Sequence, residues 1–321
     1  MSILISVRNE EKHIPILLHQ LDQLDYPTDK LQILIGDDSS TDDTWNLLKK
    51  NKHSFIECVR ISTVKSQLKG KMNVLAQLSE KATGEYLIYT DADVVLDPLW
   101  AKAHVSAYEN NVNIVGGITV VSGECVFHKL QNIDLILHQG MLKVLGDLGS
   151  TISMMGNNLS FSKIKFDEIG GYDGMPFSAV EDVALINKVV KNGGHGIIFH
   201  TNELKVETNG QKSLSALFSQ RMRWSQAISF IPTWLRLLFI VKLLFVPATF
   251  YLIALNPNFS FLLLIQIILV AILSNQVAKR IKFKLSWWQA VVYNFIEPIF
   301  YFSLLLVKLL PLNLKWKERT Y

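Results

Sequence analysis

The sequence has few cysteines, little net charge and no internal repeats. Its two cysteines, Cys58 and Cys125, match no disulfide or metal-binding spacing, which is compatible with a reducing compartment. The formal net charge of +4 in 321 residues is too small to indicate nucleic-acid binding. The chain opens directly with a strand-like run at residues 3–7 rather than with a signal-peptide pattern. We therefore expect neither a secretory leader nor a nucleic-acid partner.

Hydrophobic residues are abundant and unevenly distributed. They make up 49% of the chain, yet most of the charge lies in residues 1–230, whereas 234–310 is dominated by Leu, Ile, Val and Phe. The two parts need different surroundings. We therefore expect a catalytic domain over 1–230, a membrane region of two or three apolar helices over 231–310, and a basic tail over 311–321.

The first hundred residues alternate between strand-like and helix-like patterns. Runs of β-branched and aliphatic residues predict strands at 3–7, 31–35, 55–61 and 86–89, with helical spacing between them. This alternation is typical of an α/β fold with a parallel, doubly wound sheet. Farther along, we expect a strand at 114–121, an unusually apolar helix at 127–145 and a helix that opens at Val180-Glu181-Asp182.

Two carboxylates, Asp91 and Asp93, follow the strand at 86–89, which is apolar on both faces. Ligands bind beyond the carboxyl ends of strands in open α/β sheets. Residues i and i+2 of an extended segment point the same way. A carboxylate pair suits a hard cation, and Mg²⁺ is commonly held by one or two carboxylates together with substrate phosphates. The alternative is a solvated Asp-rich turn.

Further polar clusters follow the first and second strands. Acidic and hydroxyl residues fill 37–44, and Lys69 and Lys71 open a helix just before the strand at 86–89. Taken singly, these clusters are explained by turn and capping chemistry or by a solvated first helical turn. Taken together, they place metal-binding carboxylates and phosphate-binding lysines at one edge of the sheet.

Four motifs resemble those of family 2 glycosyltransferases with the GT-A fold, in their order as well as their residues. They are Arg8-Asn9-Glu10-Glu11, Asp37-Asp38-Ser39-Ser40-Thr41-Asp42, Lys69-Gly70-Lys71-Met72-Asn73 and Asp91-Ala92-Asp93. Ser39 stands where the family often has glycine. The resemblance implies a GT-A catalytic domain, with a Rossmann-like mixed sheet, that uses a nucleotide sugar.

The resemblance also assigns roles to individual residues. It implies that Asp38 contacts the base and ribose of the nucleotide sugar, usually a UDP-sugar, and that Glu10 lines the nucleotide pocket. Lys71 is expected beside the donor phosphates. Asp91 and Asp93 are expected to hold Mg²⁺ or Mn²⁺ on the diphosphate.

Glu181 and Asp182 open a predicted helix. Judged by position alone, they are first-turn acids that the helix dipole favours. The resemblance implies instead that they are the Glu-Asp pair of the family, with Asp182 as the general base and Glu181 near the acceptor and diphosphate. An inverting transfer needs one group that accepts the proton of the acceptor hydroxyl. The metal would stabilise the departing nucleoside diphosphate.

A further motif lies in the helix expected at 214–230. Gln220, Arg223 and Trp224 are three and four residues apart, on one helix face. Arg pairs well with phosphate, and Trp supplies a flat apolar wall. These residues resemble the Gln-x-x-Arg-Trp motif of membrane-bound family 2 enzymes, which implies contacts with the acceptor and diphosphate. The motif occurs in both polysaccharide synthases and glycolipid glucosyltransferases, so it does not separate them.

The membrane region has three apolar runs. Those at 237–255 and 259–277 have spanning length and are separated by Asn256-Pro257-Asn258, which predicts a hairpin. The third, 287–310, contains Glu297-Pro298. Cations at 279–284 and in the tail are both expected on the cytoplasmic side. This common location favours a re-entrant or interfacial third segment.

Unlike many relatives, the chain does not open with a transmembrane helix. Either the reading frame begins late, or this member functions without one.

Together, these patterns predict an inverting, metal-dependent glycosyltransferase of the inner membrane, with its catalytic domain in the cytoplasm. The acceptor is expected to be a lipid or a glycan, and a lipid is favoured because polymer synthases use more helices to build a channel. The alternatives are a processive polysaccharide synthase subunit and a catalytically silent membrane scaffold that binds nucleotide sugars. The intact acidic motifs argue against the scaffold.

Overall fold

The computed structural model describes residues 1–65, 67–108, 112–308, 315–316 and 319–320. The chain forms two compact units. Unit 1 comprises Met1–Val120 and Leu142–Asn209, and unit 2 comprises Val121–Met141 and Gly210–Tyr321. Segments 121–141 and 210–230, which we expected in the catalytic domain, thus group with the apolar C-terminal helices.

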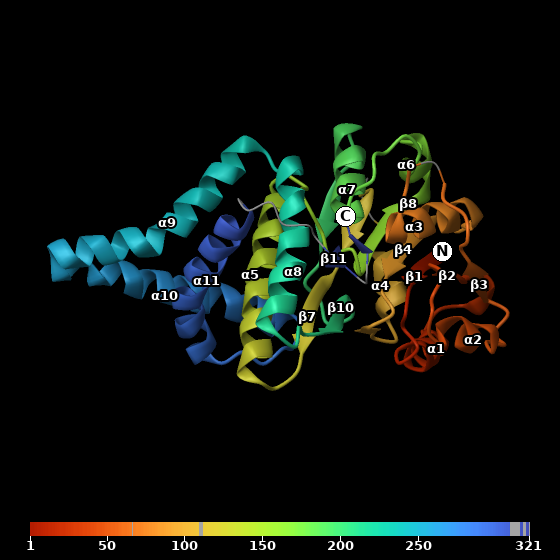
Figure 1. Ribbon diagram of the computed structural model, residues 1–321, viewed down its shortest axis with the longest axis horizontal. Helices are drawn as coiled ribbons and strands as arrows, with labels where there is room; N and C mark the ends of the chain where they lie inside the picture. Colours follow the sequence, from red (N-terminus) through yellow and green to blue (C-terminus); the bar gives the residue numbers. More distant parts are fainter. Residues whose placement is uncertain (66, 109–111, 309–314, 317–318, 321) are drawn as a thin grey trace. The chain divides into compact units, whose positions relative to one another are not determined.

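A seven-stranded sheet forms the centre of unit 1 (Figure 1). The strand order is β3 (Ile56–Arg60), β2 (Gln32–Asp37), β1 (Ser2–Val7), β4 (Tyr86–Thr90), β8 (Asn158–Ser162), β6 (Ile114–Gly116) and β9 (Gly196–Ile198). Neighbours among β1 to β4 run parallel, so their carboxyl ends meet at one edge. β8 pairs antiparallel with β4 and β6. The sheet is therefore mixed, as the GT-A resemblance implies, rather than wholly parallel.

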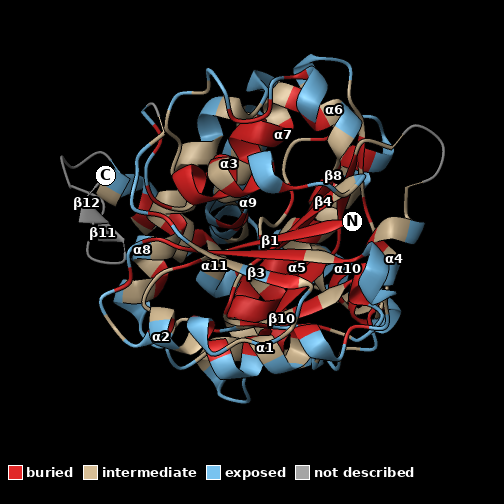
Figure 2. Cartoon of the chain, turned by 90° about the vertical axis from the view of Figure 1, so that its right-hand side faces the viewer, coloured by how far each residue is buried: buried red, intermediate tan, exposed pale blue. Residues whose placement is uncertain are grey.

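Side chains along these strands alternate between two buried cores. Leu4 and Leu34 pack on one face, whereas Ile3, Ile5 and Ile33 pack on the other. Both faces are covered, which explains why the strands are apolar throughout. Figure 2 shows them in red between helices. The covering helices are α3 (Gly70–Lys81) and α7 (Glu181–Lys191) on one face and α1 (Ile14–Asp22) and α4 (Trp100–Ser106) on the other.

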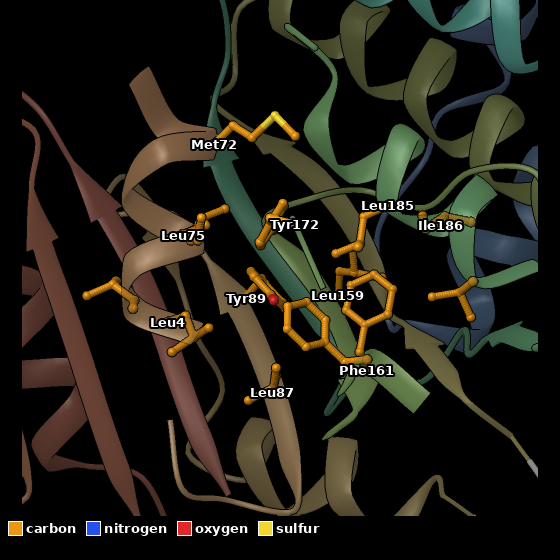
Figure 3. Close-up of a cluster of buried hydrophobic side chains, with 14 of the residues drawn as sticks. Leu4, Met72, Leu75, Leu87, Tyr89, Leu159, Phe161, Tyr172, Leu185 and Ile186 are labelled. Carbon is orange, nitrogen blue, oxygen red and sulfur yellow. The ribbon is translucent and has the colours of Figure 1, made fainter. Parts of the chain in front are cut away.

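Figure 3 shows the buried core on the face of the sheet that α3 and α7 cover. Tyr89 of β4 meets Phe161 of β8 edge to face, with ring centroids 5.6 Å apart. Such aromatic pairs contribute about 0.5–1.5 kcal/mol beyond their buried area. Met72 of α3 and Leu185 of α7 pack into the same cluster. Packing in this core therefore fixes α3 and α7 against β4 and β8.

The strand expected at 114–121 is in fact two strands in different sheets. β6 ends at Gly116, and the next strand joins a three-stranded sheet. A Cβ at Gly117 would lie 2.2 Å from the carbonyl oxygen of Leu204 and 2.4 Å from Nδ2 of Asn158, so only glycine fits. Periodicity misses this switch because the whole run is buried. The second sheet has the order β5 (Val94–Val95), β10 (Lys205–Asn209) and β7 (Ile118–Ser122).

The structure contains further helices and strands. They are η1 (Thr28–Lys30), α2 (Thr44–Lys49), α5 (Val126–Asp147), α6 (Lys163–Glu168), α8 (Leu214–Trp224), η2 (Ser225–Phe230), β11 (Lys315–Trp316) and β12 (Arg319–Thr320). The helix expected at 214–230 thus ends at Trp224 and continues as the 3₁₀ helix η2.

Unit 2 contains three described helices that are long and apolar enough to cross a membrane. They are α9 (Thr233–Leu255), α10 (Ser260–Arg280), which is preceded by η3 (Pro257–Phe259), and α11 (Trp287–Lys308). The predicted turn at 256–258 joins the first two. α11 continues through Pro298, so the helix is uninterrupted there. The expected tail at 311–321 lies largely outside the described residues.

Candidate active site

The loops after β1 and β2 are bonded to each other. Arg8 Nη1 donates to the carbonyl oxygen of Asp38 at 2.5 Å, and the backbone N–H of Glu10 donates to Thr44 Oγ1 at 2.7 Å. Asp37 and Asp38 are both buried. The structure thus brings Glu10 and Asp38, both expected at the nucleotide, onto neighbouring loops at one edge of the sheet.

Ser39 lies in the left-handed region, with a φ of +53°. This conformation costs a residue other than glycine about 1–2 kcal/mol, which explains why glycine suits the position. Ser39 Oγ donates to the carbonyl oxygen of Ile61 at 2.9 Å. A hydrogen bond of this kind contributes about 0.5–1.5 kcal/mol and offsets much of the strain.

Lys71 joins two of the expected site carboxylates. Its Nζ donates to Asp91 Oδ1 at 2.6 Å and lies 3.4 Å from Glu181 Oε1. Burial alone would lower the pKa of Lys71, but the carboxylates of Asp91, Glu181 and Asp182 raise it above its usual value. The lysine therefore stays protonated. Sequence analysis assigned Lys71 to the donor phosphates but missed this bridge, because hydrophobic periodicity carries no signal for contacts between α3, β4 and α7.

Asp182 lies in the first turn of α7 and is partly exposed. Its Oδ1 accepts the backbone N–H of Val183 at 2.8 Å. A Cβ at Gly156 would lie 2.5 Å from Asp182 Oδ2. Glycine at position 156 therefore leaves the room that the carboxylate occupies. The sequence alone gives no signal for this contact, because Gly156 and Asp182 are far apart along the chain.

Asp91 and Asp93 could hold a metal ion. Ala92 between them is buried in the core, whereas both carboxylates are partly exposed. The donor set consists of hard oxygens, which suits Mg²⁺ or Mn²⁺. Within the described residues, no group of three or more His, Cys, Asp or Glu side chains could hold a metal. Mg²⁺ held by one or two carboxylates commonly takes its other ligands from substrate phosphates and water.

The Gln-x-x-Arg-Trp residues lie in α8 of unit 2. Arg221, which sequence analysis did not single out, contacts two other residues of this stretch. Its guanidinium carbon lies 4.3 Å from the ring centroid of Trp224, and its Nη1 donates to Gln220 Oε1 at 2.8 Å. Arg223 is partly buried. The spacing of a basic residue three positions before Trp224 was the available signal for Arg221.

Residues 2–183, more than half of the chain, match the family model described as "Glycosyl transferase family 2". The chain belongs to this family. The expectation of a transferase is therefore confirmed at the level of the family. The match covers the carboxylates after β1, β2 and β4 and the first turn of α7.

The family 2 chain is similar to curated proteins that differ in their named activities. The probable glycosyltransferase YdaM of Bacillus subtilis is 25% identical over 72% of this chain and 56% of its own length. The poly-beta-1,6-N-acetyl-D-glucosamine synthase of Staphylococcus epidermidis is 23% identical, over 70% of this chain and 54% of its own. The beta-monoglucosyldiacylglycerol synthase of Nostoc is 24% identical, over 70% and 48%. The chain thus spans about half the length of these relatives.

Among solved structures, a mannosyltransferase from Pyrobaculum calidifontis, in complex with GDP-Man and Mn²⁺, is similar in fold. The TM-score is 0.60 over 96% of this chain and 86% of that chain, at 17% sequence identity. At this identity the similarity shows the fold alone. The expected GT-A-like α/β fold followed by apolar helices is confirmed.

Proposed function

We propose that this chain is an inverting, metal-dependent glycosyltransferase that moves one sugar from a nucleotide donor to a hydroxyl group of a membrane lipid. The observation that carries the proposal is the junction of Lys71 with Asp91 and Glu181, directly beside Asp182. One protonated lysine there joins the expected metal ligand to the expected acid-base pair. The function rests on family membership together with this junction.

The donor is proposed to bind along the carboxyl ends of β1, β2 and β4. Glu10 and Asp38 would face the nucleoside, with a UDP-sugar as the favoured donor. Asp91 and Asp93 would hold Mg²⁺ or Mn²⁺, which supplies positive charge for the departing diphosphate. Lys71 adds a second cation next to the metal ligands. The Mn²⁺ found with the Pyrobaculum enzyme supports a divalent cation.

Asp182 is proposed as the general base. Its carboxylate is partly exposed, so an acceptor hydroxyl can approach it. One carboxylate oxygen is held by the backbone of Val183, which fixes the side-chain orientation. Proton acceptance by a positioned side chain typically contributes 10²–10⁴-fold to the rate. Glu181, Gln220, Arg223 and Trp224 are proposed to contact the acceptor or the diphosphate.

A lipid acceptor is proposed because of the helices of unit 2. Three described helices have the length and composition to meet a membrane. The glucosyldiacylglycerol synthase among the relatives uses a lipid, according to its name. A processive polysaccharide synthase is the second candidate, and the Staphylococcus relative is named as a polysaccharide synthase. The cations at 279–284 favour a cytoplasmic location for the catalytic domain of an inner-membrane protein.

The test is a donor panel applied to membranes that contain the full chain. UDP- and GDP-sugars are supplied with and without Mn²⁺, and the lipid extract is analysed by mass spectrometry. A lipid heavier by one sugar, formed only with metal, is the expected product. Polymer in place of glycolipid would favour the synthase. Measurable nucleotide binding without any product would contradict the proposal and favour the scaffold.

A further inference from the structure

A buried polar cluster in unit 2 surrounds Asp134 of α5. Its Oδ2 accepts a hydrogen bond from Arg221 Nη2 at 2.8 Å. Its Oδ1 accepts the hydroxyl groups of Tyr293 and Tyr301 at 2.9 and 3.0 Å. The side chain of Asp134 is 15% exposed and that of Arg221 is 5% exposed. Three helices, α5, α8 and α11, thus meet at one carboxylate.

The tyrosines belong to a polar face of an otherwise apolar helix. Tyr293, Glu297 and Tyr301 are each four residues apart, so they share one side of α11. The hydroxyl oxygen of Tyr293 also lies 2.8 Å from Glu297 Oε1, so the two carboxylates share its one proton, and Lys242 of α9 pairs with Glu297. An apolar helix keeps such residues only where they have partners, because unpaired polar groups are costly in apolar surroundings.

Asp134 remains charged in this setting. Burial alone would raise the pKa of Asp134, but Arg221 and the hydroxyl group of Tyr293 hold it below its usual value. A buried ion pair contributes little net stability, whereas removing one partner is strongly destabilising because it leaves an uncompensated charge. The pair therefore acts mainly by fixing geometry.

Arg221 connects Asp134 to two other residues of α8. The guanidinium group of Arg221 stacks on Trp224 and donates to Gln220. Without an anchor, an arginine side chain loses rotamer entropy when its guanidinium stacks on a ring. The carboxylate of Asp134 and the two tyrosines therefore restrict where the Trp224 ring can lie.

From these contacts we propose that Asp134, acting through Arg221, is a positioning residue that holds Gln220 and Trp224 in the orientation that transfer requires. Asp134 itself touches neither sugar nor nucleotide in this role. Tyr293 and Tyr301 are its supports, so α11 stabilises the motif helix as well as meeting the membrane. The inference rests on the proposed function for its catalytic part, but its structural part can be measured without any transfer.

The central experiment compares Asp134→Asn with the unsubstituted full chain in detergent or nanodiscs. Asparagine keeps the size of the side chain and removes the charge that orients Arg221. We expect kcat to fall about tenfold to a hundredfold, because small misplacements of a binding wall are costly. The KM for the nucleotide sugar should change less than kcat, because the proposed nucleoside and metal contacts, Glu10, Asp38 and Asp91, are not altered. Asp134→Glu should recover part of the rate.

A spectroscopic readout separates positioning from loss of folding. The emission of Trp224 is isolated by subtracting the spectrum of a Trp224→Phe variant in each background, because the chain has seven tryptophans. Iodide should quench this emission more strongly in Asp134→Asn than in the unsubstituted chain. Tyr301→Phe, which removes a single hydroxyl, should give an intermediate change and keeps the test valid if Asp134→Asn unfolds.

The matched control is Asp147→Asn on the same helix. Asp147 pairs with Lys143 at 3.0 Å and is 47% exposed. Its substitution therefore removes an equal charge without disturbing Arg221 of α8. We expect no change in kcat or in Trp224 quenching. Unchanged Trp224 quenching in both Asp134→Asn and Tyr301→Phe would overturn the inference. A lack of transfer by the unsubstituted chain would instead count against the proposed function and leave the quenching result to stand.

Discussion

At the scale of single residues, the candidate site depends on one lysine and one glycine that bring carboxylates together. Lys71 joins Asp91 to Glu181 across α3, β4 and α7. Gly156 leaves space for the carboxylate of Asp182. The acids themselves carry the chemistry in our proposal, but their positions follow from these two neighbours. Substitutions at the acids and at the neighbours should therefore fail in different ways.

Asp182→Asn should abolish transfer while leaving donor binding intact. The amide cannot accept the proton of the acceptor hydroxyl, so the rate should fall by about 10²–10⁴-fold. Donor affinity is measured by titration calorimetry and transfer by product formation. Asp167→Asn, which alters only an exposed ion pair on α6, is the control and should behave normally. Transfer by Asp182→Asn at near the unsubstituted rate would remove this residue from the role of base.

Gly156→Ala should slow transfer by displacing the base rather than by removing it. The new methyl group would lie 2.5 Å from Asp182 Oδ2, which is closer than real Cβ contacts allow. We expect a loss of roughly tenfold or more in kcat, because a displacement of this order disturbs the reacting geometry. Gly146→Ala on α5 is the control, since its nearest neighbour would be at an ordinary 3.5 Å. Equal activity of the two variants would show that Asp182 tolerates the shift.

Asp91→Ala should weaken metal-dependent donor binding. The substitution removes one of the two proposed metal ligands and also leaves Lys71 without its 2.6 Å partner. Nucleotide-sugar affinity is measured over a range of Mn²⁺ concentrations, and the curve should move to higher metal. Lys71→Met tests the lysine separately and should weaken affinity for the diphosphate without moving the metal dependence. If the Mn²⁺ curve of Asp91→Ala matches that of the unsubstituted chain, Asp91 is no metal ligand.

At the scale of elements, Asn158 holds the junction where the chain changes sheet. Its Oδ1 accepts from Trp100 Nε1 at 2.9 Å, and its Nδ2 donates to the carbonyl oxygens of Ile118 and Leu204 at 3.2 and 2.8 Å. The side chain is fully buried. The hydrogen bonds of Asn158 thus hold the chain where it passes from β6 to β7.

Asn158→Ala should destabilise unit 1 severely. The truncation leaves a buried indole N–H and two carbonyl groups without this partner, and each such loss costs about 1–3 kcal/mol. We expect a loss of about 3 kcal/mol or more in the free energy of unfolding, measured by chemical denaturation. Asn46→Ala, on the exposed surface of α2, should change little. A cost below about 1 kcal/mol for Asn158→Ala would show that water or a shift of the chain replaces these bonds.

The elements that sequence analysis predicted well are those whose pattern is local. β1, β2 and β4 are continuous apolar runs followed by polar residues, and α7 begins at Glu181 as expected. The misses depend on contacts between distant segments. Gly117 permits a change of sheet, and Arg221 finds Asp134, 87 positions away. Hydrophobic period and turn chemistry do not encode such pairs, so the anchoring of the motif helix could not be predicted.

At the scale of the whole molecule, the two units differ in character. Unit 1 holds most of the segment that matches the family 2 model, whereas unit 2 carries three described helices that are long and apolar enough to cross a membrane. The three candidate spans differ in how far they are buried. In the most apolar stretch of each helix, 11% of the residues of α9 and α10 are buried, compared with 28% of those of α11.

The polar cluster argues that α11 lies at the membrane surface. Tyr293, near the first third of α11, bonds to Asp134 of α5, a helix outside the set of candidate spans. At the other end, Lys308 Nζ donates to the carbonyl oxygen of Ser225, just after α8. Both contacts tie α11 to segments outside the candidate spans, although Glu297 also pairs with Lys242 of α9. At the centre of a bilayer Glu297 would carry a heavy cost, which this ion pair would reduce only in part.

We therefore predict that both ends of α11 lie on the side of the catalytic unit. Cys58 and Cys125 are first replaced by serine, and single cysteines are then placed at exposed positions 258, 282 and 308 for labelling in intact cells. Position 258, in the turn between α9 and α10, should react with an impermeant reagent from outside. Positions 282 and 308 should react only after the membrane is permeabilised. Position 282 serves as the control for the α9 and α10 hairpin, because its location depends only on that pair.

If 258 and 308 both react from outside while 282 does not, α11 crosses the membrane. In that case the cluster around Asp134 would have to be buried below the membrane surface, where its ion pair could be retained only at a large desolvation cost.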